Sequence, residues 1–158
     1  MKVADFACGA GFFARAAARL VGARGVVWAV DAHQELLPRL KNISLAEGLR
    51  NVEVLQGNIE RTGGTHLPEA SFDLVLVPNA LFASEHKDTV AKEAGRVLKK
   101  GGRVLLVDWS DSHGGLGPAP AHVLTAAAAQ KIFEGAGFVY ERQVPAGAYH
   151  WGVIMRKK

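Results

Sequence analysis

Short apolar runs alternate regularly with segments of helical period along this chain, and that alternation limits the fold more than any other feature. Five runs have the length and apolar content of buried strands: Lys2–Ala7, Gly25–Val30, Val52–Leu55, Phe72–Val77 and Arg103–Val107. Three segments with a period near 3.6 residues stand among them: Phe12–Val21, His33–Glu47 and Asp88–Leu98. Strands joined by helical crossovers form a parallel sheet that is covered on both faces. The alternation therefore predicts an α/β fold with a doubly wound, mostly parallel sheet.

The last third of the chain departs from this alternation. Thr125 is a predicted N-cap for a helix that runs to Glu134. Two strand-like runs follow, Phe138–Val144 and Tyr149–Met155, with only Pro145–Ala148 between them. A loop this short joins antiparallel strands, because parallel strands need a crossover of a dozen or more residues. The chain is therefore predicted to end in an antiparallel pair.

No linker, internal repeat or low-complexity tract divides the 158 residues, a length that suits one domain. Residues 1–158 are therefore predicted to form a single domain. The stretch Gly114–Pro120 is the one segment expected to be flexible, because it is rich in glycine and proline. Lys99–Gly102 is expected to end the preceding helix, since its glycines stop a helix and its cations favour the carbonyl end.

Cysteine content and charge narrow the class of protein. The single cysteine, Cys8, excludes a disulfide framework and a multi-cysteine metal site, and it fits a reducing, cytoplasmic location. The first twenty residues contain Asp5, Arg15 and Arg19, so they form neither a signal peptide nor a membrane span. The net charge is +4, from 19 Lys and Arg against 15 Asp and Glu. Because the basic residues are scattered, charge permits a nucleic-acid partner but does not favour one.

Polar side chains stand at the carboxyl end of every predicted parallel strand. They are Asp5, Asp31, Asn58, Asn79 and Asp108. In open parallel sheets, ligands bind at this edge. A single Asp or Asn at a strand end is explained equally well as a turn former. Five of them on one edge indicate a ligand site.

The glycine loop after the first strand admits two interpretations. Gly9-Ala-Gly11-Phe-Phe-Ala14 fits the dinucleotide pattern G-x-G-x-x-A, and Asp31 lies 22 residues beyond Gly9, where a ribose-binding acid belongs. A nicotinamide-dependent oxidoreductase is therefore one candidate. A pyrophosphate, however, favours backbone N–H groups without a nearby carboxylate, whereas this chain places Asp5 inside the preceding strand.

A carboxylate at that point suits a ligand that carries positive charge. S-adenosylmethionine has an ammonium, a sulfonium and a carboxylate, and its net charge is about +1. Asp5 can pair with the ammonium, directly or through water, while the N–H groups of the loop meet the carboxylate. Asp31 is placed to accept both ribose hydroxyls. The purely structural alternatives are that Asp5 caps the loop's own N–H groups and that Asp31 is the N-cap of the next helix.

Five short motifs follow one another in a definite order along the chain. They are Val3-Ala-Asp-Phe-Ala-Cys-Gly-Ala-Gly11, Val30-Asp31, Gln56-Gly-Asn-Ile59, Phe72-Asp-Leu-Val-Leu-Val77 and Val97-Leu-Lys-Lys-Gly-Gly-Arg-Val104. Together they resemble the motifs of class I S-adenosylmethionine-dependent methyltransferases. The closing segments Ala136-Gly-Phe138 and Tyr149-His-Trp-Gly152 resemble small microbial members related to ubiquinone/menaquinone-type methyltransferases. The resemblance implies a Rossmann-like sheet of seven strands in the order 3-2-1-4-5-7-6, with the last strand antiparallel, in agreement with the predicted terminal pair.

The resemblance also implies cofactor contacts, position by position. The methionyl part of S-adenosylmethionine would be cradled by Asp5, Ala7, Cys8, Gly9 and Gly11, and the ribose would be bound by Asp31. The adenine would be bordered by Ala32 and His33, with Asn58 and Ile59 at its edge and face. Beside the transferable methyl would lie Asn79 and Ala80. Two positions depart from the family pattern, since Ala7 replaces its first glycine and Asn58 replaces an adenine-contacting acid.

Methyl transfer is an in-line displacement at a sulfonium carbon that leaves S-adenosylhomocysteine. The protein mainly aligns the reactants and excludes water, and a general base is needed only if the nucleophile carries a proton of high pKa. The cofactor motifs therefore identify no catalytic residue. The candidate proton acceptors are His86, His113, His122, Tyr149, His150 and Asp108.

The sequence does not identify the methyl acceptor. Val77-Pro-Asn-Ala-Leu81 differs from the Asn/Asp-Pro-Pro-aromatic motif of amino methyltransferases, so methylation of a flipped base is a poor fit. Met1 stands just before the first strand, so no leading helices are expected to cap the acceptor site. An open site suits a bulky acceptor, or a second copy of the chain that covers it. Two other hypotheses remain, a non-catalytic S-adenosylmethionine-binding module or subunit and the nicotinamide-dependent oxidoreductase.

Overall fold

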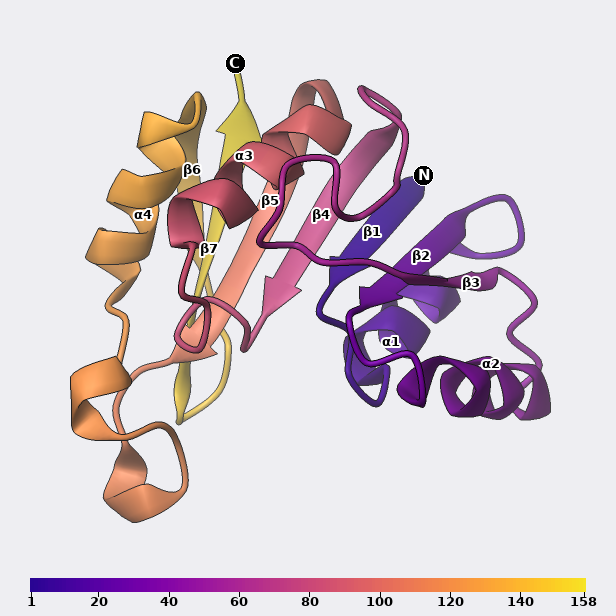
Figure 1. Cartoon of the computed structure of the whole chain (residues 1–158), viewed down its shortest axis with the longest axis horizontal. Helices are drawn as coiled ribbons and strands as arrows, with labels where there is room; N and C mark the ends of the chain where they lie inside the picture. The colour runs from indigo at the N-terminus through magenta and orange to yellow at the C-terminus, as the bar shows by residue number, and fades with distance from the viewer.

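The computed structural model describes all 158 residues and contains one seven-stranded sheet (Figure 1). Its strands are β1 (Lys2–Phe6), β2 (Val26–Asp31), β3 (Val52–Gln56), β4 (Phe72–Pro78), β5 (Leu98–Trp109), β6 (Phe138–Val144) and β7 (His150–Lys157). Their order across the sheet is β3-β2-β1-β4-β5-β7-β6. The predicted fold class and strand order are both confirmed.

β7 is the strand that runs against its neighbours. It pairs antiparallel with β5, from Arg103 opposite Arg156 to Trp109 opposite His150, and antiparallel with β6 on its other side. The pairs among β1, β2, β3, β4 and β5 are all parallel. The short connection between β6 and β7 dictates this reversal, because it is too short for a crossover. The predicted terminal pair is confirmed.

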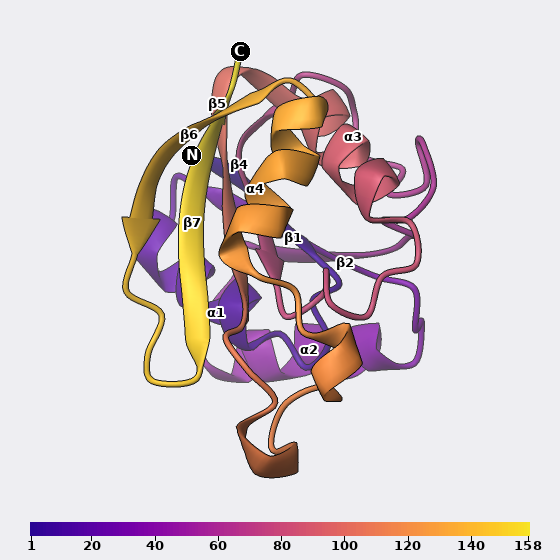
Figure 2. The same ribbon diagram turned by 90° about the vertical axis from the view of Figure 1, so that its left-hand side faces the viewer.

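Four α-helices cover the sheet. They are α1 (Phe12–Val21), α2 (Leu36–Ala46), α3 (Lys87–Val97) and α4 (Ala126–Gly135). Two 3-10 turns, η1 (His113–Gly115) and η2 (Pro120–His122), lie between β5 and α4. α3 and α4 pack together on one side of the strands (Figure 2), whereas α1 and α2 pack against β1, β2 and β3. Thr125 caps α4 as predicted, since its Oγ1 accepts a hydrogen bond from the Ala128 N–H at 3.1 Å.

The hydrophobic core lies in two layers, one on each face of the sheet. Val3 and Ala4 are neighbours on β1 but belong to different clusters, because successive side chains of a strand point to opposite faces. The larger cluster includes Leu106 and Phe133 and lies on the side of α3 and α4. The smaller one includes Leu40 and lies on the side of α1 and α2. The alternation of apolar runs and helices thus produces the two-faced core that it predicts.

α2 begins three residues later than the sequence predicts. The helix was expected from His33, but it starts at Leu36. Pro38 explains the difference, because it has no N–H to donate to the Gln34 carbonyl and its ring would clash with that oxygen. Residues 33–35 form a turn instead, in which the Leu36 N–H donates to the His33 carbonyl at 3.1 Å.

β5 begins earlier than the sequence predicts. The segment Lys99–Gly102 was expected to end α3 in a turn, but the helix ends at Val97 and these residues are already part of β5. Leu98 takes extended dihedral angles and pairs with Phe72, and the register then shifts before the regular pairing with β4 resumes. Gly101 has a φ of 77°, which lets the strand bend there without steric strain. The glycines of this segment therefore allow an irregularity within β5 and do not form a turn after α3.

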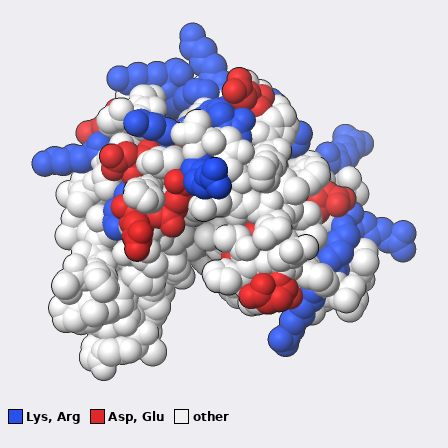
Figure 3. All heavy atoms as spheres, in the orientation of Figure 1, with Lys and Arg blue, Asp and Glu red and all other residues white.

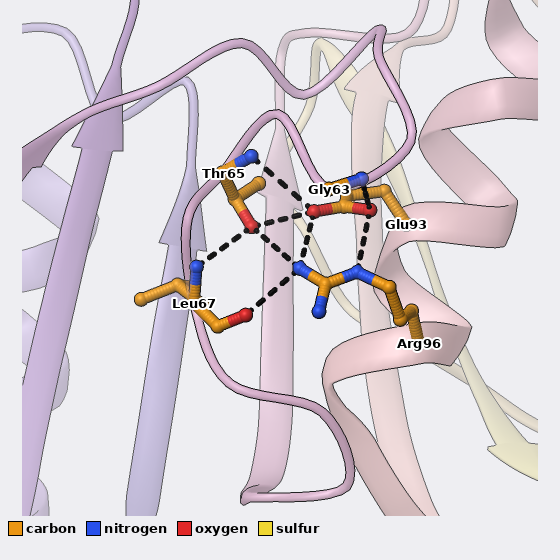
Figure 4. Close-up of polar contacts among 5 residues, drawn as sticks. All are labelled: Gly63, Thr65, Leu67, Glu93 and Arg96. Atoms are coloured by element: carbon orange, nitrogen blue, oxygen red, sulfur yellow. Dashed lines mark hydrogen bonds and ion pairs between the residues drawn. The ribbon is translucent and has the colours of Figure 1, made fainter.

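The connection between β3 and β4, residues 57–71, contains no helix and is fastened to α3 by a buried ion pair (Figure 4). Glu93, only 1% exposed, accepts hydrogen bonds from the Gly63 N–H at 2.8 Å and from Thr65 Oγ1 at 2.6 Å. Arg96 Nη2 donates to Glu93 Oε1 at 2.7 Å and to the Leu67 carbonyl at 2.8 Å. Burial raises the pKa of Glu93, but the hydrogen bonds from Arg96, Thr65 and Gly63 outweigh it and hold that pKa below its ordinary value. The hydrogen bonds of Glu93 and Arg96 thus hold this connection against α3.

Surface charge is unevenly distributed. In the space-filling view (Figure 3), the lobe at the lower left, where η1 and η2 lie, shows no Lys, Arg, Asp or Glu. Residues 112–130 contain no such side chain. A notch separates this lobe from the part of the molecule that carries α1 and α2, at the edge where the parallel strands end. None of the helices combines the length and the apolar character needed to span a membrane.

Candidate functional site

A cavity of about 280 Å³ lies where β1, β2, β3 and β4 end. Eight of the predicted site residues line it: Ala7, Asp31, Ala32, His33, Asn58, Ile59, Asn79 and Ala80. Four lining residues were not predicted: Gly57, Glu60, Ala83 and Ser84. Gly57 could have been inferred from its place beside Asn58. Glu60, Ala83 and Ser84 line the cavity because of the tertiary arrangement of their loops, which no sequence signal indicates. A second, polar hollow of about 420 Å³ shares Ala32, Gly57 and Asn58 with it.

The glycine loop between β1 and α1 forms the wall of the cavity beside the end of β1. Ala7, Gly9 and Gly11 all have positive φ, at 56°, 54° and 83°. Ala7 therefore adopts a left-handed conformation, which a glycine would adopt without strain. Its side chain lines the cavity, whereas Cys8, Gly9 and Gly11 shape the loop without lining it. The Cys8 N–H donates to the Val30 carbonyl at 3.0 Å, which fixes the loop to β2.

Gly11 is required for close packing of the loop on α2. A Cβ atom at this position would lie 2.0 Å from Leu40 Cδ1. Substituting Gly11 with alanine is therefore expected to lower the free energy of unfolding by about 2 kcal/mol, from overpacking and the positive φ together. Gly9→Ala is the matched control, because its φ is also positive but a Cβ there meets nothing within 4 Å. Urea denaturation should show that Gly9→Ala lowers the free energy of unfolding by only about 1 kcal/mol. Equal losses in the two variants would contradict the packing argument.

Asp31 ties the end of β2 to both neighbouring loops. Its Oδ2 accepts a hydrogen bond from the Gly9 N–H at 2.9 Å, and its Oδ1 accepts one from the His33 N–H at 2.9 Å. The His33 Nδ1 lies 3.0 Å from the same Oδ1. Asp31 is not the N-cap of α2, which begins at Leu36 and has no side-chain cap. That structural alternative is wrong, and the carboxylate borders the cavity instead.

Asp5 is buried beneath the glycine loop, and no side chain of the protein pairs with its carboxyl group. Its side chain is 0% exposed, and neither carboxylate oxygen has a hydrogen-bond partner of good geometry in the protein. The alternative that it caps the loop's N–H groups is therefore wrong. Burial raises the pKa of Asp5 to about 8, an effect that the Ala14 N–H offsets in part and the charge of Asp31 increases. Asp5 does not line the cavity itself.

Cys8 lies close to both acids and is not an activated thiol. Burial raises its pKa, and the charges of Asp5 and Asp31 raise it further. A cysteine acts as a nucleophile only as the thiolate, which these surroundings disfavour. Cys8 therefore has a structural role in the loop.

The ends of β3 and β4 complete the cavity. Asn58 Oδ1 accepts a hydrogen bond from the Glu60 N–H at 2.8 Å, so its side chain forms a turn at the mouth. Ile59 is buried behind it and presents an apolar surface. Asn79 has a φ of 54° and donates its N–H to the Val107 carbonyl at 2.8 Å. The chain then turns at Ala80 across the cavity.

Asp108, predicted at the end of β5, does not line the cavity. It is 1% exposed, and its Oδ2 accepts a hydrogen bond from the Phe82 N–H at 3.0 Å, while Oδ1 accepts one from the Trp109 N–H at 2.8 Å. Burial raises its pKa. Asp108 therefore positions the segment between β4 and α3, which carries Ala80, Ala83 and Ser84.

The predicted proton acceptors lie outside the cavity. Three of them form a cluster of aromatic rings at the end of β5 and the start of β7: Trp109 lies 4.3 Å from His150, and His113 lies 4.9 Å from Tyr149, between ring centroids. His113 Nε2 also lies 2.9 Å from Ser110 Oγ. His86 and His122, at the start of α3 and in η2, do not line the cavity either.

Comparison with known proteins places the chain in a family. A family model described as "Methyltransferase domain" matches residues 1–146. The ubiquinone/menaquinone biosynthesis C-methyltransferase UbiE of Laribacter hongkongensis is 37% identical over 110 residues, which are 70% of this chain and 43% of that protein. The UbiE protein of Neisseria meningitidis serogroup C is 36% identical over 109 residues, 69% of this chain and 43% of that protein. The chain thus spans less than half the length of these relatives.

Comparison with solved structures also finds a methyltransferase with the same fold. A SAM-dependent methyltransferase from Aquifex aeolicus superimposes with a TM-score of 0.88 at 28% identity, covering 99% of this chain and 81% of that one. The [4+2]-cyclase SpnF superimposes with a TM-score of 0.81 at only 15% identity, covering 99% of this chain and 74% of that one. The second likeness shows the fold alone, and one fold carries different reactions. From the family model and the sequence identity to its relatives, the chain belongs to the class I S-adenosylmethionine-dependent methyltransferase family.

Proposed function

We propose that this protein binds S-adenosylmethionine in the cavity at the ends of β1 to β4 and transfers its methyl group to an acceptor. The observation that carries the proposal is the pair of acids beneath and beside that cavity. Asp5 is a buried carboxyl group without a partner, and Asp31 is a carboxylate at the cavity wall. A ligand with an ammonium group at one end and a ribose at the other satisfies both acids.

The amino-acid end of the cofactor fits the region of Asp5 and α1. The ammonium would pair with the Asp5 carboxylate, directly or through one water. The cofactor's carboxylate would meet the first N–H groups of α1, which no side chain caps. Cys8, Gly9 and Gly11 shape the backbone between these two groups, and Ala7 adds a methyl group beside the ligand.

The nucleoside end fits the region of Asp31 and Ile59. The Asp31 carboxylate already accepts two backbone N–H groups, but a carboxylate has about four lone-pair sites and can also accept the ribose hydroxyls. The adenine would lie between Ala32 and the apolar surface of Ile59, with His33 at its border. Asn58 would accept from the adenine amino group with the remaining lone pair of Oδ1. Asn79 and Ala80 would lie beside the sulfonium methyl.

The bound cofactor supplies an electrophilic methyl group, and the chain supplies alignment and exclusion of water. Asp108 contributes indirectly, because it fixes the Phe82 N–H and thereby the segment that turns across the cavity. No lining residue is needed as a base when the acceptor is already a good nucleophile.

The single cysteine bears on the location of the protein. Cys8 is a buried free thiol, which fits a reducing compartment, and we infer a cytoplasmic protein on that ground.

Isothermal titration calorimetry with S-adenosylhomocysteine and with NAD separates the two cofactor interpretations. The expected result is saturable binding of S-adenosylhomocysteine and none of NAD. Binding of NAD alone would overturn the proposal in favour of an oxidoreductase. A panel of acceptors with radiolabelled S-adenosylmethionine then distinguishes an enzyme from a binding module, since a module binds the cofactor without turnover on any acceptor.

A further inference from the structure

The carboxyl group of Asp5 lies in surroundings that disfavour its negative charge. It is completely buried, and of all side chains only Asp5 and His150 bury polar atoms that lack a hydrogen-bond partner in the protein. An ionised carboxylate in such a place loses its hydration without gaining a partner, so the neutral acid is favoured. The neutral acid is therefore the favoured form as long as no cation lies beside it.

No cation of the protein compensates this charge. β1 lies between β2 and β4 in the sheet, and the residues opposite Asp5 on these two strands are Ala29 and Leu76, which carry no charge. The charge of Asp31, at the end of β2, raises the pKa of Asp5 further, and the Cys8 thiol of the loop carries no positive charge.

The helix that follows the loop, α1, brings no cation to Asp5 either. Its nearest contribution is the Ala14 N–H, which lowers the pKa of Asp5 only in part. The two arginines of α1, Arg15 and Arg19, are both paired with Glu47. The balance leaves the pKa of Asp5 at about 8, so most molecules hold the proton at pH 7.

We propose that Asp5 carries a proton in the cofactor-free protein and releases it to solvent when the ammonium group of the cofactor binds. The inference rests on the proposed function, because it takes S-adenosylmethionine or S-adenosylhomocysteine as the ligand. The balance is simple: the neutral acid and the ammonium become a carboxylate–ammonium pair plus one free proton. Cofactor affinity is then linked to pH.

The sign of this linkage follows from the proton that must leave. Below the pKa of the free protein, binding requires deprotonation, so affinity falls about tenfold for each pH unit. The dissociation constant of S-adenosylhomocysteine should therefore fall about tenfold between pH 6 and pH 7 and level off above about pH 8. The released proton should number about 0.9 at pH 7 and approach zero at pH 9.

Calorimetry at pH 7 in phosphate and in Tris tests the inference, because these buffers take up a released proton with very different heats. The wild-type protein titrated with S-adenosylhomocysteine is expected to show a buffer-dependent heat equivalent to about one proton. 5′-Methylthioadenosine is the matched ligand, since it keeps the nucleoside and the sulfur but lacks the ammonium. It should bind, if more weakly, without releasing a proton.

The Asp5→Asn variant should bind S-adenosylhomocysteine with no proton release and with an affinity that does not change between pH 6 and 8. If this variant does not fold, the wild-type comparison of the two buffers still decides. Binding of S-adenosylhomocysteine with equal heats in both buffers overturns the inference and leaves the proposed function intact. Absence of any binding overturns the proposed function itself.

Discussion

Replacing Asp31 with alanine is expected to weaken binding of S-adenosylhomocysteine by about 100-fold or more. Hydrogen bonds to a charged acceptor are worth about 1.5–3 kcal/mol each, and this carboxylate would accept two from the ribose. The change also removes the acceptor for the Gly9 and His33 N–H groups, so the glycine loop loses one of its hydrogen bonds to β2. Calorimetric titration at pH 7.5 measures the effect.

Asp73→Ala is the matched control for this experiment. Asp73 is also an aspartate on a strand of the sheet, but it lies near the beginning of β4 and accepts hydrogen bonds from the Lys2 N–H and Lys99 Nζ, away from the cavity. Its removal should leave the affinity for S-adenosylhomocysteine within about twofold, since neither Asp73 nor its hydrogen-bond partners line the cavity. An Asp31→Ala protein that binds as tightly as the Asp73→Ala protein would remove Asp31 from the site.

Replacing Glu93 with alanine is expected to lower the free energy of unfolding by about 3 kcal/mol. Removing one partner of a buried ion pair leaves the other without compensation, which typically costs about 3–5 kcal/mol. Arg96 is partly exposed, so the lower end of that range applies. The change also leaves the Gly63 N–H and the Thr65 hydroxyl without their acceptor. Urea denaturation followed by circular dichroism measures the loss.

Glu141→Ala provides the control for Glu93→Ala. Glu141 also pairs with an arginine, Arg103, but this pair is on the surface, where such interactions contribute about 0.2–1 kcal/mol. The two variants thus compare the same chemistry at different burial. Because the pKa of Glu93 is held below its ordinary value, its contribution is present at neutral pH and is lost as the pH falls through that lowered pKa. Similar losses in the two variants would show that the connection between β3 and β4 does not depend on Glu93.

Most of the architecture could be predicted from local patterns. Buried strands of a parallel sheet are nearly continuous apolar runs, so each strand was visible before its partners were known. The edge that holds the cavity was equally predictable, because parallel strands present all their carboxyl ends together. Asp31, Asn58 and Asn79 therefore meet at one cavity although they are far apart in the sequence.

Two of the errors in the prediction arise where a contact between elements overrules a local signal. The glycines of Lys99–Gly102 suggest a turn, but pairing of Leu98 with Phe72 draws the segment into β5. Asp108 has the same sequence signature as the lining residues, yet it bonds to the Phe82 N–H and is buried behind the cavity.

The amino-acid sequence by itself determined the α/β class, the positions of the strands and the edge at which polar groups collect, because hydrophobic periodicity and turn residues act over a few neighbouring positions. The strand order came from the family resemblance and was confirmed. Only the tertiary structure decided that Asp5 has no partner while Asp31 has several, and that Glu93 holds a distant connection. Hydrogen bonds and desolvation depend on which atoms meet in space, and residues 30 positions apart meet only once the sheet has formed.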